Sequence, residues 1–589
     1  MLVVKNLQIK FLPILKKYYP LLVCWGSVTL INLNKAFHID DTFHLEAAKY
    51  IVDHLSSPMS GLINWGNSPT PMNEHNQPPL FFLVIGIVIK LFNADEITLH
   101  LLLSIFSFLA LFYFQKILQL LQIKKTGIYL TLLAFNPAFI VNQNLMTDIP
   151  ILACALVFFY FLLKSSLGQG DKNISYAMIA LSFGLLIKYA LLPELIVAII
   201  GLLLSKKFKQ LTMLLIPVIT LTLWSIWNYY EFGDIHLFGR PQKIYTNLQL
   251  WAFIGTLGAI SSFSLLIIPT FLKKQFTNSV ISIITAGIVG CLVYVIQTDE
   301  LTDKTIQQFL HTLFLFNGTI VLLFIGYKFI VFYRKEKERT LRITNSLLLV
   351  QICLIATFIV VYAPFMATRH LLLILPFILL FFKNEIEQMD GYFKTIFLSV
   401  SISFGLILGI SDYSYADFYR VKAKEICLSG ATKWTVGHWG WQWYAKKAGM
   451  KIYSLEDDWK LKKGDYLIVP KNISKQTINQ NLKFDTLYYL TEKFHFTTLF
   501  SGNDFASMYN SFYQKPAWTI SKSTVDTIYV CKITKSVPYR KKLTEVEKII
   551  VEIKNDPFWY ATVKTKAKKQ KIPLDSMLLL DAKWLLEQK

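Results

Sequence analysis

The sequence predicts a polytopic α-helical membrane protein, and three observations lead to that fold class. The chain has 589 residues, of which 54% are hydrophobic and only 17% are charged, with a mean hydropathy of +0.43. Apolar runs near the roughly 20 residues that a spanning helix needs recur as far as residue 411. Basic residues cluster in short loops between these runs, as the positive-inside rule expects. The chain therefore has too little polar material for an ordinary soluble protein of this length.

The apolar runs predict about thirteen spans, and the basic loops predict their orientation. The first span follows a lysine-rich N-terminus, which we expect in the cytoplasm. The expected spans are 19–37, 97–118, 127–146, 149–164, 174–188, 190–204, 211–227, 249–271, 278–297, 309–332, 344–365, 370–383 and 393–411. With this count the most basic short loop, 334–342, is cytoplasmic, and the acidic first outer loop, 38–96, lies on the opposite side.

One apolar segment in the first outer loop, 78–92, is not counted as a span. It begins with two prolines, is short and contains Lys90. These features suit a helix that lies on the membrane surface. Counting it as a span would invert every later loop and place the basic clusters outside. We therefore expect juxtamembrane helices in 38–96.

The last third of the chain has a different composition and predicts a small extracytoplasmic α/β domain. Residues 431–455 indicate a strand, a glycine turn, a helix and a second strand, and "KLKKGDYLIVP" adds a Gly-Asp turn into an apolar strand. The expected divisions are a membrane domain over 1–413, the α/β domain over 414–542 and a helical tail over 543–589. Asp556-Pro557 and Pro573 indicate helix starts in that tail.

The formal net charge of +22 does not indicate a nucleic-acid partner. Proteins that bind nucleic acids present a basic patch or stripe. In this chain the lysines are divided between the loops and the C-terminal third, with no basic stripe interleaved with stacking aromatics. We expect a protein embedded in a membrane, without nucleic acid as partner.

Ionisable residues at the edges of the apolar runs are the candidates for function, because charges at a membrane are costly and usually have a role. In the predicted topology they all lie on the outer side. They are Asp40 and Asp41 after the first span, Asp148, Lys188, Arg240 in a loop, and Arg369 with His370.

Structural explanations exist for single members of this set. Asp148 could cap a helix, Lys188 could extend to lipid headgroups, and Arg369 with His370 could anchor a hairpin at the interface. Neighbouring aspartates are harder to explain in this way, because adjacent like charges repel.

Together these residue types suit transfer of a sugar from a lipid phosphate. A carboxylate can take a proton from an incoming hydroxyl or orient it, and we expect Asp40 and Asp41 in that catalytic role. Lysine and arginine bind a phosphate and stabilise its charge as it leaves. We expect the other five residues to bind substrate. No cofactor is required, although His38, His44 and His75 could hold a divalent metal ion with nearby carboxylates.

Several motifs occur in an order that resembles a known enzyme class. The acidic pair is followed by "NQPPLFFLVIGIVIKLF", "MTDIPILACAL", "LLIKYALLP" and "TRHLLLILPFILLF". This order is similar to that of GT-C glycosyltransferases of the protein O-mannosyltransferase and lipid A aminoarabinose transferase kind, over roughly 15–410. The resemblance implies a multi-span bundle, a polyprenyl-phosphate sugar donor, a lipid, glycan or protein acceptor, and an inverting displacement. It also implies a bacterial inner-membrane protein with its α/β domain in the periplasm.

The resemblance also assigns positions within the motifs. By position, Asp40 and Asp41 match the acidic pair, Asp148 matches the aspartate of a later hairpin, and Lys188 matches a lysine that faces the lipid phosphate. Arg369 falls near an outer-hairpin cation or tyrosine. Asn76-Gln77 replaces a Glu-Lys pair of the aminoarabinose branch, which weakens any assignment of that particular donor.

Two other classes of function remain as alternatives. A lipid-linked saccharide transporter or flippase would place ionisable residues in the middle of its spans and show internal symmetry. The predicted spans are apolar through their centres. A non-catalytic scaffold that displays the outer domain would leave the one-sided gathering of charges unexplained.

Overall fold

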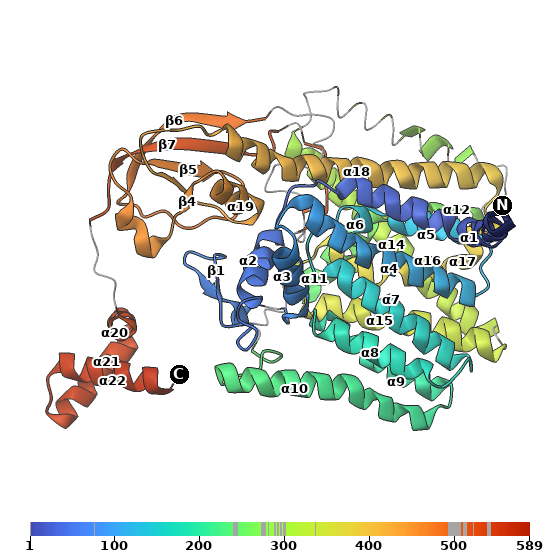
Figure 1. Ribbon diagram of the computed structural model, residues 1–589, viewed down its shortest axis with the longest axis horizontal. Coiled ribbons are helices and arrows are strands. Elements are labelled where there is room, and N and C mark those ends of the chain that lie inside the picture. Colours follow the sequence, from blue (N-terminus) through green and yellow to red (C-terminus); the bar gives the residue numbers. More distant parts are fainter. Residues whose placement is uncertain are drawn as a thin grey trace.

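The computed structural model describes residues 2–75, 77–239, 246–271, 302–335, 337–492, 508–509, 515–521, 523–538 and 544–588, with single positions between 279 and 297. Long helices lie side by side in a bundle, and a small sheet domain adjoins one end of it (Figure 1). One large hydrophobic core runs through the bundle, from Leu21 in the first helix to Ala423 in the last.

Six helices of the described residues are long and apolar enough to cross a membrane. They are α4 (Glu96–Leu120), α7 (Asp148–Ser166), α10 (Leu215–Phe232) with the preceding η3 (Phe208–Leu214), α14 (Asp303–Lys335), α15 (Arg339–Tyr362) and α18 (Gly391–Glu425). Five of them contain a whole predicted span, and α15 contains 344–362 of the predicted span 344–365. The number thirteen itself is not confirmed, because the other predicted spans are shorter or interrupted.

Two of the predicted spans are interrupted inside an apolar run. The segment 127–146 forms α5 (Thr126–Ala134) and the short α6 (Pro137–Ile140), with Asn136 between them accepting a hydrogen bond from the Ala138 N–H at 2.9 Å. Asparagine before proline is a strong helix start, so it ends the preceding helix. The segment 249–271 likewise divides into α11 (Thr246–Ile260) and α12 (Ser264–Phe271).

The remaining predicted spans correspond to short helices. They are α8 (Asn173–Leu185), η2 (Tyr189–Leu191) with α9 (Pro193–Leu204), and η4 (Thr368–Leu373) with α16 (Leu375–Phe381), which α17 (Lys383–Gln388) follows. The first predicted span, 19–37, is the end of α1 (Leu2–Asn32), and its last five residues are outside the helix. The predicted span 278–297 falls largely outside the described residues.

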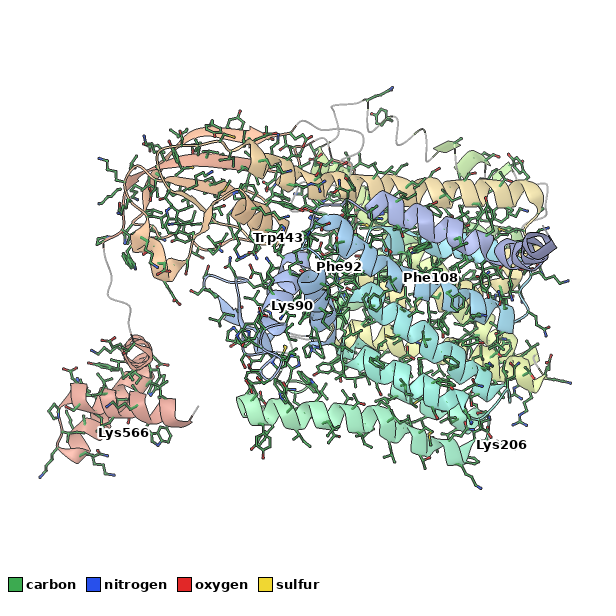
Figure 2. All side chains as sticks on the ribbon, viewed as in Figure 1. Lys90, Phe92, Phe108, Lys206, Trp443 and Lys566 are labelled. Atoms are coloured by element: carbon green, nitrogen blue, oxygen red, sulfur yellow. The ribbon has the colours of Figure 1, made fainter. Side chains whose placement is uncertain are left out.

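The first outer loop carries two short helices, as the sequence predicts. They are α2 (Asp41–Ile51) and α3 (Leu80–Leu91), and between them lie β1 (Leu62–Ile63), β2 (Thr70–Pro71) and η1 (Met72–Glu74). The α3 helix packs on α2 and has exposed apolar residues at its C-terminal end, where Phe92 is 67% exposed (Figure 2). A 12-residue apolar helix is too short to span a bilayer.

The helix α18 continues past residue 413, where the sequence analysis divides the two domains, and ends at Glu425. Ion pairs three residues apart stabilise this extension, namely Arg420 with Asp417 at 2.6 Å and Lys422 with Glu425 at 2.9 Å. The helix runs the length of the bundle and ends at the sheet domain (Figure 1). The same helix therefore belongs to both parts of the protein.

The C-terminal domain is a five-stranded mixed sheet with strand order β4-β3-β5-β7-β6. Its elements are β3 (Lys433–Thr435), α19 (Trp439–Lys447), β4 (Lys451–Ile452), η5 (Leu455–Lys460), β5 (Tyr466–Pro470), β6 (Lys483–Thr491) and β7 (Thr527–Lys535). Strand β3 is parallel to β4 and β5, and β7 is antiparallel to β5 and β6. The first strands and α19 lie where the sequence pattern places them, and α19 packs against α2 and α18.

Three helices follow the sheet and have a hydrophobic core of their own. They are α20 (Glu545–Asn555), α21 (Pro557–Gln570) and α22 (Leu574–Gln588). Asp556 starts α21 by accepting a hydrogen bond from the Trp559 N–H at 3.0 Å, in the capping role that its position before Pro557 predicts.

Candidate active site

Asp40 and Arg369, which are far apart in the sequence, form an ion pair at one end of the bundle. Asp40 directly precedes α2, and Arg369 is the second residue of η4. The Arg369 Nη2 donates to Asp40 Oδ2 at 3.0 Å. The Arg369 side chain is only 6% exposed, whereas that of Asp40 is 26% exposed. A buried guanidinium thus holds a carboxylate that solvent can still reach.

A second ion pair joins Asp148 and Lys188 and is connected to the first. Asp148 begins α7, where a helix N-terminus favours negative charge. Its Oδ1 accepts from Lys188 Nζ at 2.7 Å, and its Oδ2 lies 3.6 Å from Arg369 Nε. Asp40, Arg369, Asp148 and Lys188 therefore form one continuous chain of alternating charges, which we call the charge chain. Four separate elements of the fold contribute to it.

Exposure differs along the charge chain in a way that matters for binding. Arg369 and Asp148 in its middle are each 6% exposed, whereas the Lys188 side chain at one end is 19% exposed. Asp40, at the other end, is the most exposed of the four. A ligand can thus approach a carboxylate at one end and an ammonium at the other, while the buried middle fixes both.

His44, one turn into α2, supports Asp40 from the protein side. Its Nδ1 lies 2.7 Å from the Asp40 carbonyl oxygen, and its Nε2 lies 2.8 Å from Gln77 Oε1. Burial lowers the pKa of His44, and the nearby Asp40 carboxylate partly opposes that shift. A neutral imidazole carries a single N–H, so it can donate to only one of these two oxygen atoms at a time.

Asp41 is next to Asp40 in the sequence but does not join the charge chain. Its side chain is fully buried, and its Oδ2 accepts from the His38 N–H at 2.7 Å. Burial raises the pKa of Asp41 to about 8, while that hydrogen bond and the Lys35 charge act in the opposite direction. Of the two predicted catalytic carboxylates, Asp40 is thus the one that is accessible to solvent and paired with Arg369.

The raised pKa of Asp41 predicts a pH-dependent stability. An unfolded chain ionises this aspartate near pH 4, whereas the folded protein keeps it protonated until about pH 8. The folded state therefore binds more protons in this window, and stability falls as pH rises through it. Asp41→Asn should remove this loss and stabilise the protein by ~1–3 kcal/mol at pH 8. The test is to measure thermal unfolding midpoints of the wild-type protein and of Asp41→Asn in detergent from pH 5 to pH 8. If the midpoint changes equally with pH in both proteins, the prediction is refuted.

The two other predicted substrate-binding residues are His370 and Arg240. His370 is the neighbour of Arg369 and lies beside the Phe365 ring, with 5.6 Å between ring centroids. No hydrogen bond of its Nδ1 to the described residues is present. Arg240 lies outside the described residues.

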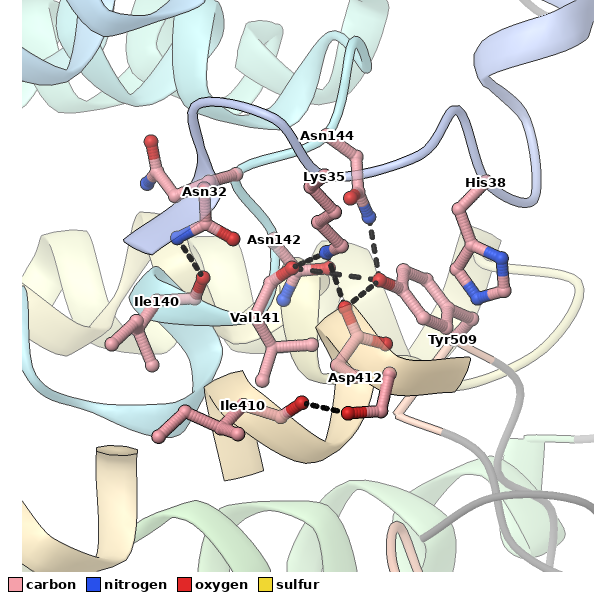
Figure 3. Close-up of polar contacts among 12 residues, drawn as sticks. Asn32, Lys35, His38, Ile140, Val141, Asn142, Asn144, Ile410, Asp412 and Tyr509 are labelled. Atoms are coloured by element: carbon pink, nitrogen blue, oxygen red, sulfur yellow. Dashed lines mark hydrogen bonds and ion pairs between the residues drawn. The ribbon is translucent and has the colours of Figure 1, made fainter. Parts of the chain in front are cut away.

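The sequence did not single out a buried cluster behind Asp41. Lys35 forms an ion pair with Asp412 in α18 and donates to the Val141 carbonyl at 3.0 Å. The Tyr509 hydroxyl donates to Asp412 Oδ2 at 2.9 Å and accepts from the Asn144 amide at 2.6 Å (Figure 3). Two features of the sequence could have indicated this cluster. Lys35 lies inside the first apolar run, and Asp412 directly follows the last one.

The three histidines considered as metal ligands, His38, His44 and His75, have different partners. His38 packs against the rings of Tyr415 and Tyr509, with centroid distances of 4.6 and 5.3 Å. His75 Nε2 lies 3.0 Å from Thr70 Oγ1, and both nitrogens of His44 have partners. Within the described part of the chain, no group of three or more His, Cys, Asp or Glu residues is arranged to hold a metal ion.

Comparison with solved structures finds similar chains of one kind. ArnT from Cupriavidus metallidurans bound to undecaprenyl phosphate matches with a TM-score of 0.44 and 10% identity, over 77% of this chain and 92% of ArnT. The oligosaccharyltransferase AglB from Archaeoglobus fulgidus, in complex with an inhibitory peptide and a dolichol-phosphate, matches with a TM-score of 0.42 and 12% identity, over 77% of this chain and 70% of AglB. No protein-family model and no curated protein sequence matches the chain.

Proposed function

We propose that this protein is a membrane glycosyltransferase that moves a sugar from a polyprenyl-phosphate donor to a lipid, glycan or protein acceptor. The observation that carries the proposal is the charge chain, which places an accessible carboxylate and an accessible ammonium on one buried framework. Assembling four charges at the end of an apolar bundle is costly, so such a set indicates a function.

The charges suit the two partners of this reaction. Lys188 and Arg369 would bind the donor phosphate, since ammonium and guanidinium groups form charge-assisted hydrogen bonds with it. Asp40 would accept the proton of the acceptor hydroxyl. The hydroxyl oxygen bonds to the anomeric carbon, the bond from that carbon to the phosphate oxygen breaks, and its electron pair stays on the phosphate. Direct displacement of this kind inverts the anomeric centre.

We propose the outer face of a bacterial inner membrane as the location of this reaction, in agreement with the predicted topology. The N-terminus would then be cytoplasmic and the α/β domain periplasmic, because the basic loops lie opposite the charge chain. A polyprenyl chain is long and apolar, so its phosphate would lie at the membrane surface, at the level of the charge chain.

Lys188→Ala tests the proposal directly. The purified protein is incubated with polyprenyl-phosphate-linked sugars and an envelope extract, and released polyprenyl phosphate is measured by mass spectrometry. Loss of the ammonium should reduce release about 100-fold or more, because the leaving phosphate loses its accessible counter-charge.

A matched control is available in the first outer loop. Lys90 pairs with Asp53 at 3.2 Å, with both side chains more than 60% exposed, and such surface pairs contribute little. Lys90→Ala should release polyprenyl phosphate at the wild-type rate. Full activity of Lys188→Ala, or movement of the intact donor across the membrane without release, would contradict the proposal and favour a flippase.

A further inference from the structure

The segment that joins α1 to α2 is irregular but buried. Residues 33–40 contain no full helical turn, yet Lys35, Phe37 and His38 are each at most 1% exposed. Buried backbone without regular structure depends on other elements for its hydrogen bonds. This segment, which we call the strap, ends at Asp40, so whatever holds the strap also places the candidate base.

The strap is strained immediately before Asp40. Ile39 has φ +47°, in the left-handed region that a β-branched residue rarely adopts. Strained conformations persist only when the surrounding contacts enforce them, and they are common at functional sites. Loosening those contacts would let Ile39 relax and would shift Asp40 away from Arg369.

The α/β domain supplies one set of these contacts. The Tyr444 hydroxyl in α19 accepts from the Phe37 N–H at 2.8 Å and donates to Glu96 Oε1 at 2.7 Å. Tyr444 is only 3% exposed. Gly440 of the same helix packs so closely on the Phe37 carbonyl that a Cβ would not fit. Trp443 contacts the Phe37 ring edge to face, at 5.5 Å between centroids.

The C-terminal half of α18 supplies the second set. The Lys35 ammonium is fully buried and pairs with Asp412, while also donating to the Val141 carbonyl (Figure 3). Both ends of the strap's buried part are therefore fixed by residues from the C-terminal region of the chain. The strap needs such contacts to stay ordered, because each of its residues loses conformational freedom on folding and the contacts must offset that loss.

We propose that Tyr444 and Lys35 are positioning residues that hold the strap, and thereby Asp40, in the arrangement needed for reaction. The α/β domain would then be part of the catalytic apparatus through α19, rather than an appended module. The kinetic part of this inference rests on the proposed glycosyltransferase function, whereas the structural part does not.

Tyr444→Phe is the sharpest test, since it removes one hydroxyl and keeps the ring. We expect backbone amide exchange at Phe37 and His38 to become at least ~10-fold faster, because Phe37 N–H loses its acceptor. We expect kcat for sugar transfer to fall about 10- to 100-fold with KM for the donor changed less than about twofold, since a displaced base misaligns the reaction. The full-length protein in detergent serves for both measurements.

Tyr453→Phe is the matched control. Tyr453 is a fully buried tyrosine of the same domain, and its hydroxyl accepts from the Asn479 N–H at 3.0 Å, away from the strap. Tyr453→Phe should loosen the core of the α/β domain but leave backbone amide exchange in the strap and kcat unchanged.

The outcomes separate the two proposals. Unchanged strap exchange in Tyr444→Phe, or an equal loss of kcat in both variants, would overturn the positioning role. If the wild-type protein transfers no sugar, the proposed function fails, and strap exchange alone then decides whether Tyr444 holds this segment.

Discussion

Asp40→Asn is expected to reduce sugar transfer at least ~100-fold, whereas Asp41→Asn is expected to leave it within a few-fold of wild type. The amide cannot accept the acceptor proton, and general-base catalysis contributes about 100- to 10,000-fold. Asp41 is buried away from the charge chain and is protonated near neutral pH, so it cannot take that role. Initial rates of polyprenyl-phosphate release at saturating donor measure both effects.

The comparison between these two variants decides which aspartate is the base. Asparagine has almost the shape of aspartate, and Arg369 keeps Asp148 as a partner at 3.6 Å in Asp40→Asn. The variant should therefore insert and fold normally, which gel filtration and donor binding can verify. A fully active Asp40→Asn protein, or an inactive Asp41→Asn protein that is still folded, would reverse the assignment.

Lys35→Met is expected to destabilise the protein by about 3–5 kcal/mol, the typical cost of leaving one partner of a buried ion pair without the other. Both Lys35 and Asp412 are nearly inaccessible to solvent. The single variant leaves Asp412 with the Tyr509 hydroxyl as a neutral partner. Thermal unfolding in detergent at pH 7 should show a markedly lower midpoint.

The double variant Lys35→Met/Asp412→Asn should recover most of that loss. The asparagine carbonyl can still accept from Tyr509, and replacing both charges with neutral groups of similar size is often nearly neutral in stability. If the double variant is as unstable as the single one, the ion pair is not the reason for the effect. Recovered stability with low activity would in addition agree with the positioning role of Lys35.

The residues of the charge chain could be chosen from the sequence because each is an exception in an apolar environment. Asp148, Lys188 and Arg369 interrupt or border hydrophobic runs, and a charge there needs either a partner or a function. The sequence placed them on one side of the membrane through the basic loops. It gave no means of pairing them, because residues 40, 148, 188 and 369 meet only through packing.

Local sequence rules succeeded where a structure depends on a few neighbouring residues. The Asp556-Pro557 helix start and the short surface helix before Phe92 follow from capping and length alone. The predicted number of spans is not confirmed, for the opposite reason. Asn136-Pro137 divides an apolar run that is long enough to cross a membrane. A span prediction based on hydropathy does not detect that helix break.

The sequence by itself determined that this is a membrane protein and which charged residues are candidates for function, because hydropathy and the cost of burying charge are properties of composition and order. The tertiary structure decided what those residues contact. Adjacent side chains at a helix start project in different directions, so Asp40 reaches Arg369 whereas Asp41 turns into the core. Folding also brings Tyr444 and Asp412 to the strap from nearly 400 residues away, which no local pattern encodes.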